Sequence, residues 1–216
     1  METLQDGTRR SLRRLGITDL RAVLYDLDGV LIHSAPAWYE VVKRAARHFD
    51  CPPVAPDLFR ETFGQGLEAD ARVLFPGRTP REISDFYEEA FPREIPSVEL
   101  GRGALQALAA VRARGLRQAV VTNSPRELAQ KILDQKGITR YVDAAVGAGD
   151  APEKPAPDLV RLALARLGVG AEQALYVGDS PADAEACRAA GVKMAGLGVR
   201  ADLAIGSLLE IPDIIL

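Results

Sequence analysis

The sequence is poor in cysteine, has no excess of positive charge and contains no long apolar run. Its two cysteines, Cys51 and Cys187, lie far apart and form no CxxC motif. This disfavours a disulfide framework or a zinc site and favours a reducing, cytoplasmic environment. The formal net charge of −3 gives no reason to expect a nucleic-acid partner. No apolar run approaches the roughly 18 residues that a membrane span needs, so we expect no membrane partner either.

The N-terminal segment METLQDGTRRSLRRLG is rich in arginine and lacks the apolar stretch of a secretory signal. We expect residues 1–20 to form a solvated helical extension. The rest of the chain is long enough for one large domain, or for one domain with a smaller insertion. With 216 residues and 47% hydrophobic content, either arrangement can bury a substantial core.

Short aliphatic runs that end in polar residues indicate buried β-strands. The three clearest are RAVLYD at 21–26, RQAVVTN at 117–123 and QALYVGD at 173–179. A further strand is predicted near 142–147, and weaker strand patterns occur near 191–196 and 212–216. Apolar residues at helical spacing separate the later strands. This alternation predicts an α/β fold, a doubly wound and mostly parallel sheet with helices on both faces.

The stretch from 34 to 100 has a different pattern, which predicts an inserted all-helical domain. Apolar residues recur there at helical spacing, with no convincing strand between the two stripes. The stripes are Trp38, Val41, Val42, Ala45, Ala46 and Phe49, followed by Ile83, Phe86, Tyr87 and Ala90. We therefore expect residues 1–33 and 101–216 to form the α/β core. Residues 34–100 would form a helical cap with its aromatic residues packed inside.

Polar side chains follow the clearest strands at the points where they end. Asp26 ends the first strand, Thr122 and Asn123 end the second, Asp179 ends the third, and Lys154 lies in an intervening loop. Ligands of open parallel sheets bind at the carboxyl ends of the strands, so we expect these side chains to meet. Two carboxylates about 4 Å apart repel by roughly 4 kcal/mol, which a cation would offset. Oxygen ligands without nearby histidine or cysteine favour Mg²⁺.

Four short motifs carry a family resemblance. DLDGVL at 26–31, VVTNS at 120–124, Lys154 with Pro155, and GDSPAD at 178–183 resemble, in order, the four motifs of the haloacid dehalogenase-like (HAD) hydrolases. Within that superfamily the chain looks closest to the phosphoglycolate phosphatase and β-phosphoglucomutase-like branch. The resemblance implies a Rossmann-like core. It also implies that the insertion after the first motif is a helical cap of the first type.

The resemblance further implies a role for each motif residue. Asp26 would be the nucleophile that forms an aspartyl-phosphate, and Asp28 would be the general acid and then the general base. Gly29 would support the turn that carries Asp28 away from the strand. Thr122, with the backbone N–H of Asn123, would bind the phosphoryl oxygens.

The charged groups around the phosphate also follow from the resemblance. Lys154 would supply positive charge to the nucleophile and to the transferred phosphate. Mg²⁺ would be held by Asp26, by the backbone carbonyl of Asp28 and by Asp179. Asp183 would assist directly or through water.

The cap is expected to determine the substrate. In the loop FGQGLEAD, Gly64 and Gly66 flank Gln65, which is available for hydrogen bonds to a small phosphate ester. An ordinary glycine turn is the alternative. His33 departs from the family pattern, because many relatives have an aspartate at that position. It either faces the cleft or has a structural role on the hinge side.

The sequence thus predicts a Mg²⁺-dependent phosphatase of a small phosphomonoester, either phosphoglycolate-like or a sugar phosphate. A phosphomutase of the same fold is the alternative, although the lysine-bearing glycine loop and the arginine pattern that favour a mutase are not evident. A non-catalytic binding module is a further alternative. Dehalogenation is disfavoured because Asp28 and a metal site have no place in that chemistry. The physiological substrate and the oligomeric state stay open.

Overall fold

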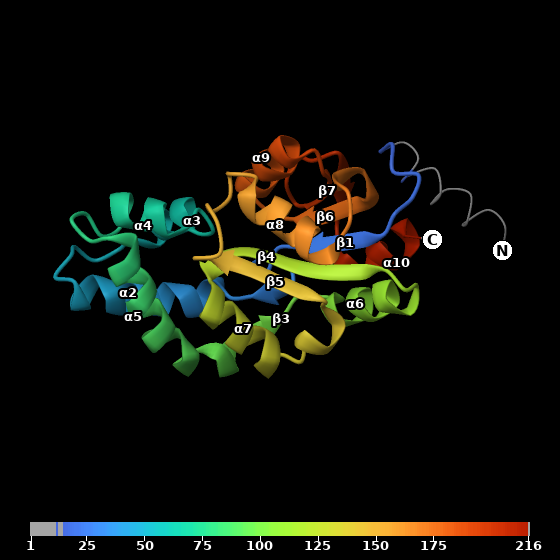
Figure 1. Ribbon diagram of the computed structural model, residues 1–216. Coiled ribbons are helices and arrows are strands. Elements are labelled where there is room, and N and C mark those ends of the chain that lie inside the picture. Colours follow the sequence, from blue (N-terminus) through green and yellow to red (C-terminus); the bar gives the residue numbers. More distant parts are fainter. Residues whose placement is uncertain (1–11, 13–14, 216) are drawn as a thin grey trace.

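The computed structural model describes residue 12 and residues 15–215, so most of the N-terminal segment and its expected helix lie outside the described residues. A six-stranded parallel sheet of order β5-β4-β1-β6-β7-β8 forms the centre of the molecule (Figure 1). Its strands are β1 (Ala22–Tyr25), β4 (Arg117–Pro125), β5 (Ala144–Ala148), β6 (Ala174–Gly178), β7 (Lys193–Leu197) and β8 (Leu203–Ile205). The predicted α/β fold with a mostly parallel sheet is confirmed.

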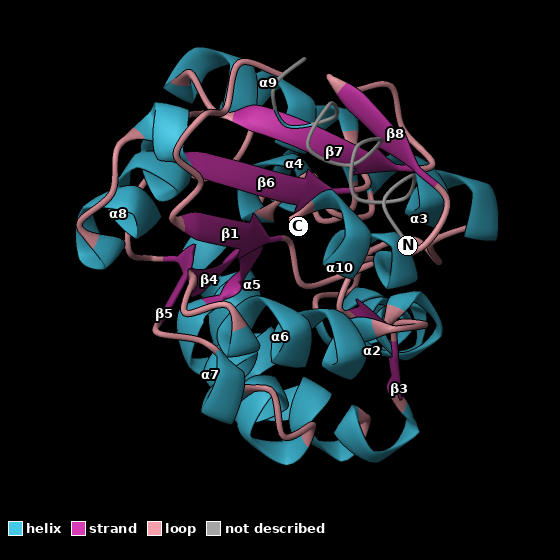
Figure 2. Ribbon diagram, turned by 90° about the vertical axis from the view of Figure 1, so that its right-hand side faces the viewer, coloured by secondary structure: helices cyan, strands magenta, loops and turns pink. Residues whose placement is uncertain are grey.

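The side chains of β1 alternate between two apolar cores. Val23 and Tyr25 belong to the core on one face of the sheet, and Ala22 and Leu24 belong to the core on the other. A strand that is covered on both faces needs a continuous apolar run. This is why the sequence pattern predicted β1. The first face is covered by α6 (Ala104–Ala113), α7 (Arg126–Gln135) and α10 (Ile211–Ile214), and the second by α8 (Asp158–Leu167) and α9 (Pro181–Ala190) (Figure 2).

The two weak strand patterns near the C-terminus have different outcomes. The pattern near 191–196 corresponds to β7, whereas residues 211–214 form the helix α10. The expectation of a strand at 212–216 is therefore wrong for the described part of that range. Pro212 lies in the first turn of the helix, where its missing N–H costs nothing. Ile211 and Ile214 are buried, and their spacing places both on one helical face.

The chain leaves the core after β2 (Ile32–His33) and returns at β3 (Glu99–Leu100). These short strands pair antiparallel, with Ile32 opposite Leu100. Between them lie the helices α2 (Ala35–His48), α3 (Pro56–Thr62), α4 (Leu67–Val73) and α5 (Pro80–Ala90), followed by two short 3₁₀ turns. Figure 1 shows this helical layer at one end of the sheet. The inserted all-helical cap is confirmed, and the exact boundaries at 34 and 100 stay a prediction.

The cap has an aromatic core of its own. The Trp38 ring meets Tyr87 edge-on, with centroids 5.0 Å apart, and meets Phe91 at 4.3 Å. Helix α5 begins at a capping box in which Thr79 accepts a hydrogen bond from the Glu82 backbone N–H. These contacts fix α2 against α5 and so fix the wall that the cap presents to the sheet. No helix within the described part of the chain is long and apolar enough to cross a membrane.

Candidate active site

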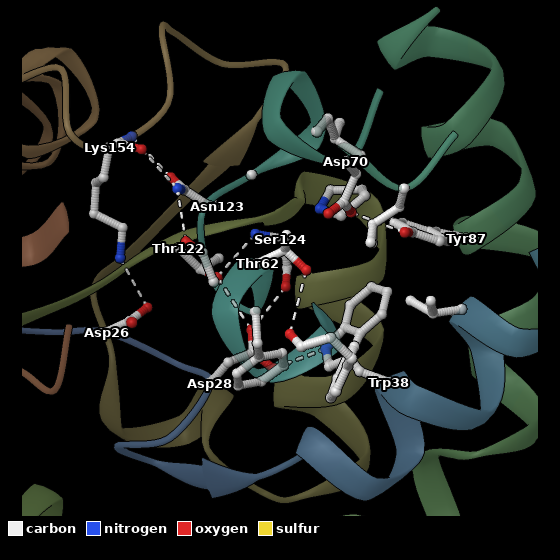
Figure 3. A pocket seen from close by; sticks show the side chains of 18 residues that line it. Asp26, Asp28, Trp38, Thr62, Asp70, Tyr87, Thr122, Asn123, Ser124 and Lys154 are labelled. Atoms are coloured by element: carbon white, nitrogen blue, oxygen red, sulfur yellow. Dashed lines mark hydrogen bonds and ion pairs between the residues drawn. The ribbon is translucent and has the colours of Figure 1, made fainter. Parts of the chain in front are cut away.

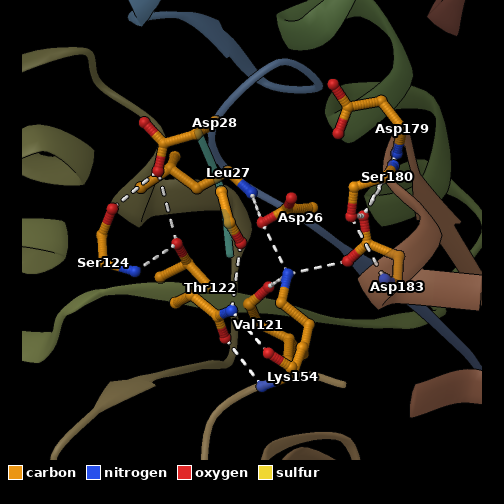
Figure 4. Close-up of polar contacts among 12 residues, drawn as sticks. Asp26, Leu27, Asp28, Val121, Thr122, Ser124, Lys154, Asp179, Ser180 and Asp183 are labelled. Atoms are coloured by element: carbon orange, nitrogen blue, oxygen red, sulfur yellow. Dashed lines mark hydrogen bonds and ion pairs between the residues drawn. The ribbon is translucent and has the colours of Figure 1, made fainter. Parts of the chain in front are cut away.

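The carboxyl ends of the central strands bring the predicted site residues together (Figure 4). Asp26 follows β1, Thr122 lies in β4, Lys154 lies in the loop after β5, and Asp179 follows β6. The Lys154 side chain is 2% exposed. Its Nζ lies 2.9 Å from Asp26 Oδ1 and 2.7 Å from Asp183 Oδ1. Groups from three of the four motifs therefore form one buried cluster.

Lys154 is a buried cation held between carboxylates. Its Nζ also lies within hydrogen-bonding distance of the Val121 carbonyl oxygen, at 3.1 Å, and of the Tyr176 hydroxyl, at 3.2 Å. Burial by itself would lower the pKa of Lys154, but the charges of Asp183 and Asp26 outweigh burial and raise the pKa above its usual range. The ammonium group is therefore charged at neutral pH and fixed in place beside Asp26.

Asn123 connects the lysine loop both to β4 and to the cap. Its Oδ1 accepts a hydrogen bond from the Lys154 backbone N–H at 2.8 Å. Its Nδ2 donates to the Lys154 carbonyl oxygen at 2.8 Å and to the Gly64 carbonyl oxygen at 3.1 Å. Sequence reasoning considered only the backbone N–H of Asn123. In the structure, the Asn123 side chain also holds the lysine loop against β4 and against the cap loop.

Three aspartates form an acidic cluster beside the lysine. Asp26, Asp179 and Asp183 each offer a carboxylate oxygen, and these oxygens lie within 4.8 Å of one another. Burial, reinforced by the charge of Asp183, raises the pKa of Asp26 well above its usual value and that of Asp179 to about 7. A cluster of oxygen donors alone fits Mg²⁺. A divalent cation there would favour the ionised form of both carboxyls.

Asp183 connects Lys154 to the Asp179 loop through hydrogen bonds. Its Oδ1 accepts from Lys154 Nζ and from the Tyr176 hydroxyl at 2.8 Å, and its Oδ2 accepts from Ser180 Oγ at 2.7 Å and from the Asp179 backbone N–H at 3.3 Å. Burial would raise the pKa of Asp183, but Lys154 and these hydrogen bonds outweigh it and lower the pKa. Ser180 also caps α9 by accepting from the Asp183 backbone N–H. The start of α9 thus positions both the lysine and the Asp179 loop.

The turn after β1 favours glycine. Gly29 has a φ of +88°, and its N–H donates to the Ile32 carbonyl oxygen at 2.8 Å. A Cβ placed on Gly29 would lie 2.0 Å from Asp179 Oδ2. Both the left-handed backbone and the close approach of Asp179 disfavour a side chain here. The turn that the sequence predicted after Asp26 is present.

Asp28 is held at the junction between the core and the cap. Its Oδ1 accepts hydrogen bonds from Trp38 Nε1, at 3.0 Å, and from the Ser34 hydroxyl. Its Oδ2 accepts from Ser124 Oγ at 2.7 Å and from Thr122 Oγ1 at 3.4 Å. Figures 3 and 4 show this carboxyl on the cap side of the site, away from the lysine. The sequence placed Asp28 on a turn but gave no sign of the tryptophan that binds it.

A pocket with a volume of about 60 Å³ lies between the motif residues and the cap (Figure 3). Asp26, Asp28, Thr122 and Lys154 lie on its core side. The cap side is mostly apolar and aromatic. It comprises Trp38, Val42, Phe59, Thr62, Phe63, Leu67, Asp70, Leu74 and Tyr87, with Gly64 and Gly66 at the loop.

Sequence reasoning missed Asp70. This residue lies on α4 between Leu67 and Leu74, and all three line the pocket. Residues at spacings of three, four and seven share one helical face. A carboxylate within the apolar face of a short helix is therefore the sequence signal that indicates Asp70 as a pocket residue.

Gln65 lies outside this pocket. Its side-chain amide donates to the Glu61 carbonyl oxygen, and the residue is exposed in a wider outer hollow. The flanking glycines turn the loop so that its backbone faces the core instead. The Leu67 N–H donates to Glu153 Oε2 at 2.8 Å, and the Gly64 carbonyl oxygen receives the bond described above. The arrangement gives no support to the expected contact between Gln65 and the phosphate ester.

His33 lies on the hinge rather than in the pocket. It is exposed, and in β2 it pairs with Glu99 of β3, where the chain returns from the cap. It is absent from the pocket-lining set of the described chain. The structure therefore favours the hinge-side alternative over a role in the cleft.

Comparison with known proteins agrees with this geometry. The family model described as "Haloacid dehalogenase-like hydrolase" matches residues 23–197. A phosphoglycolate phosphatase from Rhodospirillum rubrum is 35% identical over 186 residues, which is 80% of this chain and 77% of that protein. Among solved structures, CbbY from Rhodobacter sphaeroides with bound phosphate has a TM-score of 0.80 at 22% identity, covering 91% of this chain and 100% of the other. A β-phosphoglucomutase from Clostridium difficile has a TM-score of 0.78 at 18% identity, covering 89% and 93%.

Proposed function

Because the chain belongs to the haloacid dehalogenase-like hydrolase family, we propose that its pocket hydrolyses a small phosphomonoester through an aspartyl-phosphate, with Mg²⁺ as the cofactor. The family assignment makes the chain a phosphoric monoester hydrolase. The substrate, the metal and the intermediate are the parts that we propose. Phosphoglycolate, which names the Rhodospirillum relative, and sugar phosphates are the first esters to test.

One observation carries this proposal. Lys154 Nζ lies 2.9 Å from Asp26, while Asp26 also belongs to the oxygen-only cluster with Asp179. A fixed ammonium and a cation site on either side of one carboxylate would bring two positive charges to the phosphoryl oxygens. Phosphoryl transfer depends mainly on such positioning and on charge stabilisation.

In the proposed first step, an oxygen of Asp26 attacks phosphorus and the bond to the leaving alcohol breaks. Asp28 donates a proton to the leaving oxygen. Lys154 and Thr122 bind the equatorial phosphoryl oxygens, helped by the backbone N–H of Asn123. The aspartyl-phosphate divides one difficult displacement into two easier ones.

In the proposed second step, Asp28 accepts a proton from a water molecule that attacks phosphorus, and Asp26 is released. Mg²⁺, when bound, neutralises charge on the transferred group. The residues that would hold it are Asp26, Asp179 and the Asp28 carbonyl, with Asp183 positioned behind them. The cap, which we propose spans 34–100, closes the pocket and excludes bulk water.

Phosphate release from a panel of phosphorylated metabolites, with Mg²⁺ and with EDTA, tests this function. We expect hydrolysis that requires the metal and is abolished in Asp26→Asn, with the variant's circular dichroism unchanged. Asp85→Asn, which removes an exposed cap carboxylate, is the matched control. Metal-independent turnover, or full activity of Asp26→Asn, would contradict the mechanism. Isomerisation of a sugar phosphate faster than its hydrolysis would indicate the phosphomutase instead.

The cellular location of the protein is proposed from fewer observations. Both cysteines are free, and Cys187 is buried, which is compatible with a reducing cytoplasm. The partner that we propose is a small-molecule phosphate ester.

A further inference from the structure

The cap side of the pocket contains a single charged group, and it is negative. Among the described residues that line the pocket, Asp70 is the only charged side chain supplied by the cap. Lys154 is the only cation in the same described lining, and it is already paired with two aspartates on the core side. The part of the pocket that would receive the leaving alcohol therefore has a net negative character.

Asp70 is held in place by an aromatic residue. Its Oδ2 accepts a hydrogen bond from the Tyr87 hydroxyl at 2.8 Å. Tyr87 in turn packs edge-on against Trp38, which lines the same wall. The other carboxyl oxygen, Oδ1, receives no hydrogen bond from any described group. One oxygen thus fixes the carboxyl and the other is available to a ligand.

Burial raises the pKa of Asp70 to about 7, because the Tyr87 hydrogen bond offsets only part of the desolvation. A cation placed against Oδ1 would stabilise the ionised form. The aromatic wall adds to this preference, since ring faces attract ammonium groups. Trp38, Phe59, Phe63 and Tyr87 all line this side of the pocket.

Building on the proposed phosphatase function, we propose that Asp70 is a specificity residue that selects esters of small amino alcohols. The ammonium group of the leaving alcohol would contact Asp70 Oδ1 while its phosphate lies against both Asp26 and Lys154. Figure 3 shows Asp70 and Tyr87 on the side of the pocket opposite Asp26 and Lys154.

The same geometry disfavours an ester whose leaving group has a carboxylate. The carboxylate of phosphoglycolate would lie against Asp70 without a described cation of the cap to compensate it. Like charges in a partly buried site repel strongly. Discrimination by charge at Asp70 is therefore expected to be larger than discrimination by size.

Three esters with the same two-carbon skeleton test this inference. Phosphoethanolamine carries an ammonium group, ethyl phosphate is neutral, and 2-phosphoglycolate carries a carboxylate. We expect the kcat/KM of the wild-type enzyme to be at least tenfold higher for phosphoethanolamine than for 2-phosphoglycolate, with ethyl phosphate between them. In Asp70→Asn the value for phosphoethanolamine should fall at least tenfold and that for ethyl phosphate less than threefold. Asp85→Asn, the matched cap control, should keep all three values.

The outcomes separate this inference from the proposed function. If neither these esters nor p-nitrophenyl phosphate is hydrolysed with Mg²⁺, both fail. If ethyl phosphate or p-nitrophenyl phosphate is hydrolysed but wild type favours 2-phosphoglycolate, the selectivity assigned to Asp70 is overturned and the phosphatase stands. The ratio of the wild-type values decides this even if Asp70→Asn does not fold. Equal ratios in folded Asp70→Asn and wild type would also overturn it.

Discussion

The Trp38 indole N–H of the cap donates a hydrogen bond to Asp28 Oδ1 of the core at 3.0 Å. This bond joins the first cap helix to the carboxyl that we propose as the general acid and base. The same ring packs against Tyr87, so cap packing and the orientation of the acid depend on one side chain. We therefore expect a movement of the cap to change the orientation of the Asp28 carboxyl.

Trp38→Phe is expected to lower kcat about tenfold. Phenylalanine keeps the aromatic packing but removes a donor that orients the Asp28 carboxyl, and the loss of about 1.5 kcal/mol of hydrogen bonding corresponds to about tenfold in rate. Steady-state kinetics on any hydrolysed ester measures the effect, with thermal unfolding as the check on folding. Tyr39→Phe, which removes a cap hydroxyl bonded to a backbone carbonyl, is the control. Unchanged kcat in Trp38→Phe would show that the other three donors suffice to hold Asp28.

Lys154→Met is expected to abolish turnover and to lower the free energy of unfolding by about 3–5 kcal/mol. The substitution leaves Asp26 and Asp183 buried without their cation, and removal of one partner from a buried ion pair carries a cost of this size. Urea unfolding at pH 7 measures it. Lys193→Met is the matched control, because Lys193 and Asp202 form an exposed pair worth less than about 1 kcal/mol. Similar losses of unfolding free energy in the two variants would contradict the inference that Lys154 compensates the buried carboxylates of Asp26 and Asp183.

Gly29→Ala is expected to impair the metal site more than a generic glycine substitution. An alanine Cβ would lie 2.0 Å from Asp179 Oδ2 at a φ of +88°, so Asp179 must move. The concentration of Mg²⁺ required for half-maximal activity should therefore rise at least tenfold. Gly115→Ala is the comparison, since Gly115 has a φ of +70° but no atom within 4 Å of the added Cβ. Gly115→Ala should show only the backbone strain, about 1–2 kcal/mol. Equal Mg²⁺ requirements in the two variants would contradict the assignment of Asp179.

Asp70→Asn is expected to stabilise the protein above pH 7. The pKa of Asp70 is about 7 in the folded protein against 3.8 for the free side chain. The folded state therefore binds the proton more tightly, and stability from this group falls as pH rises from about 4 to about 7. The rise corresponds to at most about 4 kcal/mol. Asparagine carries no charge, while its amide oxygen still accepts from Tyr87.

Urea unfolding of wild type and Asp70→Asn at pH 5 and pH 8 measures this effect. The advantage of the variant should be larger at pH 8. The charge of Glu153 adds to the effect of burial on the pKa of Asp70, and Glu153 is present in both proteins. Asp85→Asn, which removes an exposed cap carboxylate, is the control. An advantage that is the same at both pH values would show that Asp70 does not titrate in this range.

The fold and the strand-end cluster were largely predictable because both depend on local patterns. A strand buried on both faces must be an apolar run, as β1 is, and a polar residue at its end must lie at the ligand-binding edge. Asp26, Thr122 and Asp179 were found in this way, and the topology placed them together. The failure at 212–216 has the same origin, because a short run of apolar residues fits a strand or a helix.

The cap side of the site was not predictable to the same degree. Gln65 looked available because its neighbours are glycines, but those glycines turn the loop so that its backbone meets Asn123 and Glu153. The spacing of Asp70 from Leu67 and Leu74 indicates one helical face but does not say what that face packs against. Its half-buried position beside Tyr87 depends on how α4 docks against α5, and spacing along the chain does not encode that long-range contact.

The sequence by itself determined which groups we propose for the chemistry. Two aspartates on either side of a turn, a hydroxyl, a lysine and a distant acidic loop are specified by motifs, and the parallel sheet has only one edge at which they can meet. The tertiary structure decided how those groups are used. Packing of the cap against the core turned Asp28 toward Trp38, and packing of α4 against α5 within the cap placed Asp70 beside Tyr87, because side-chain environment depends on neighbours that are remote in the chain.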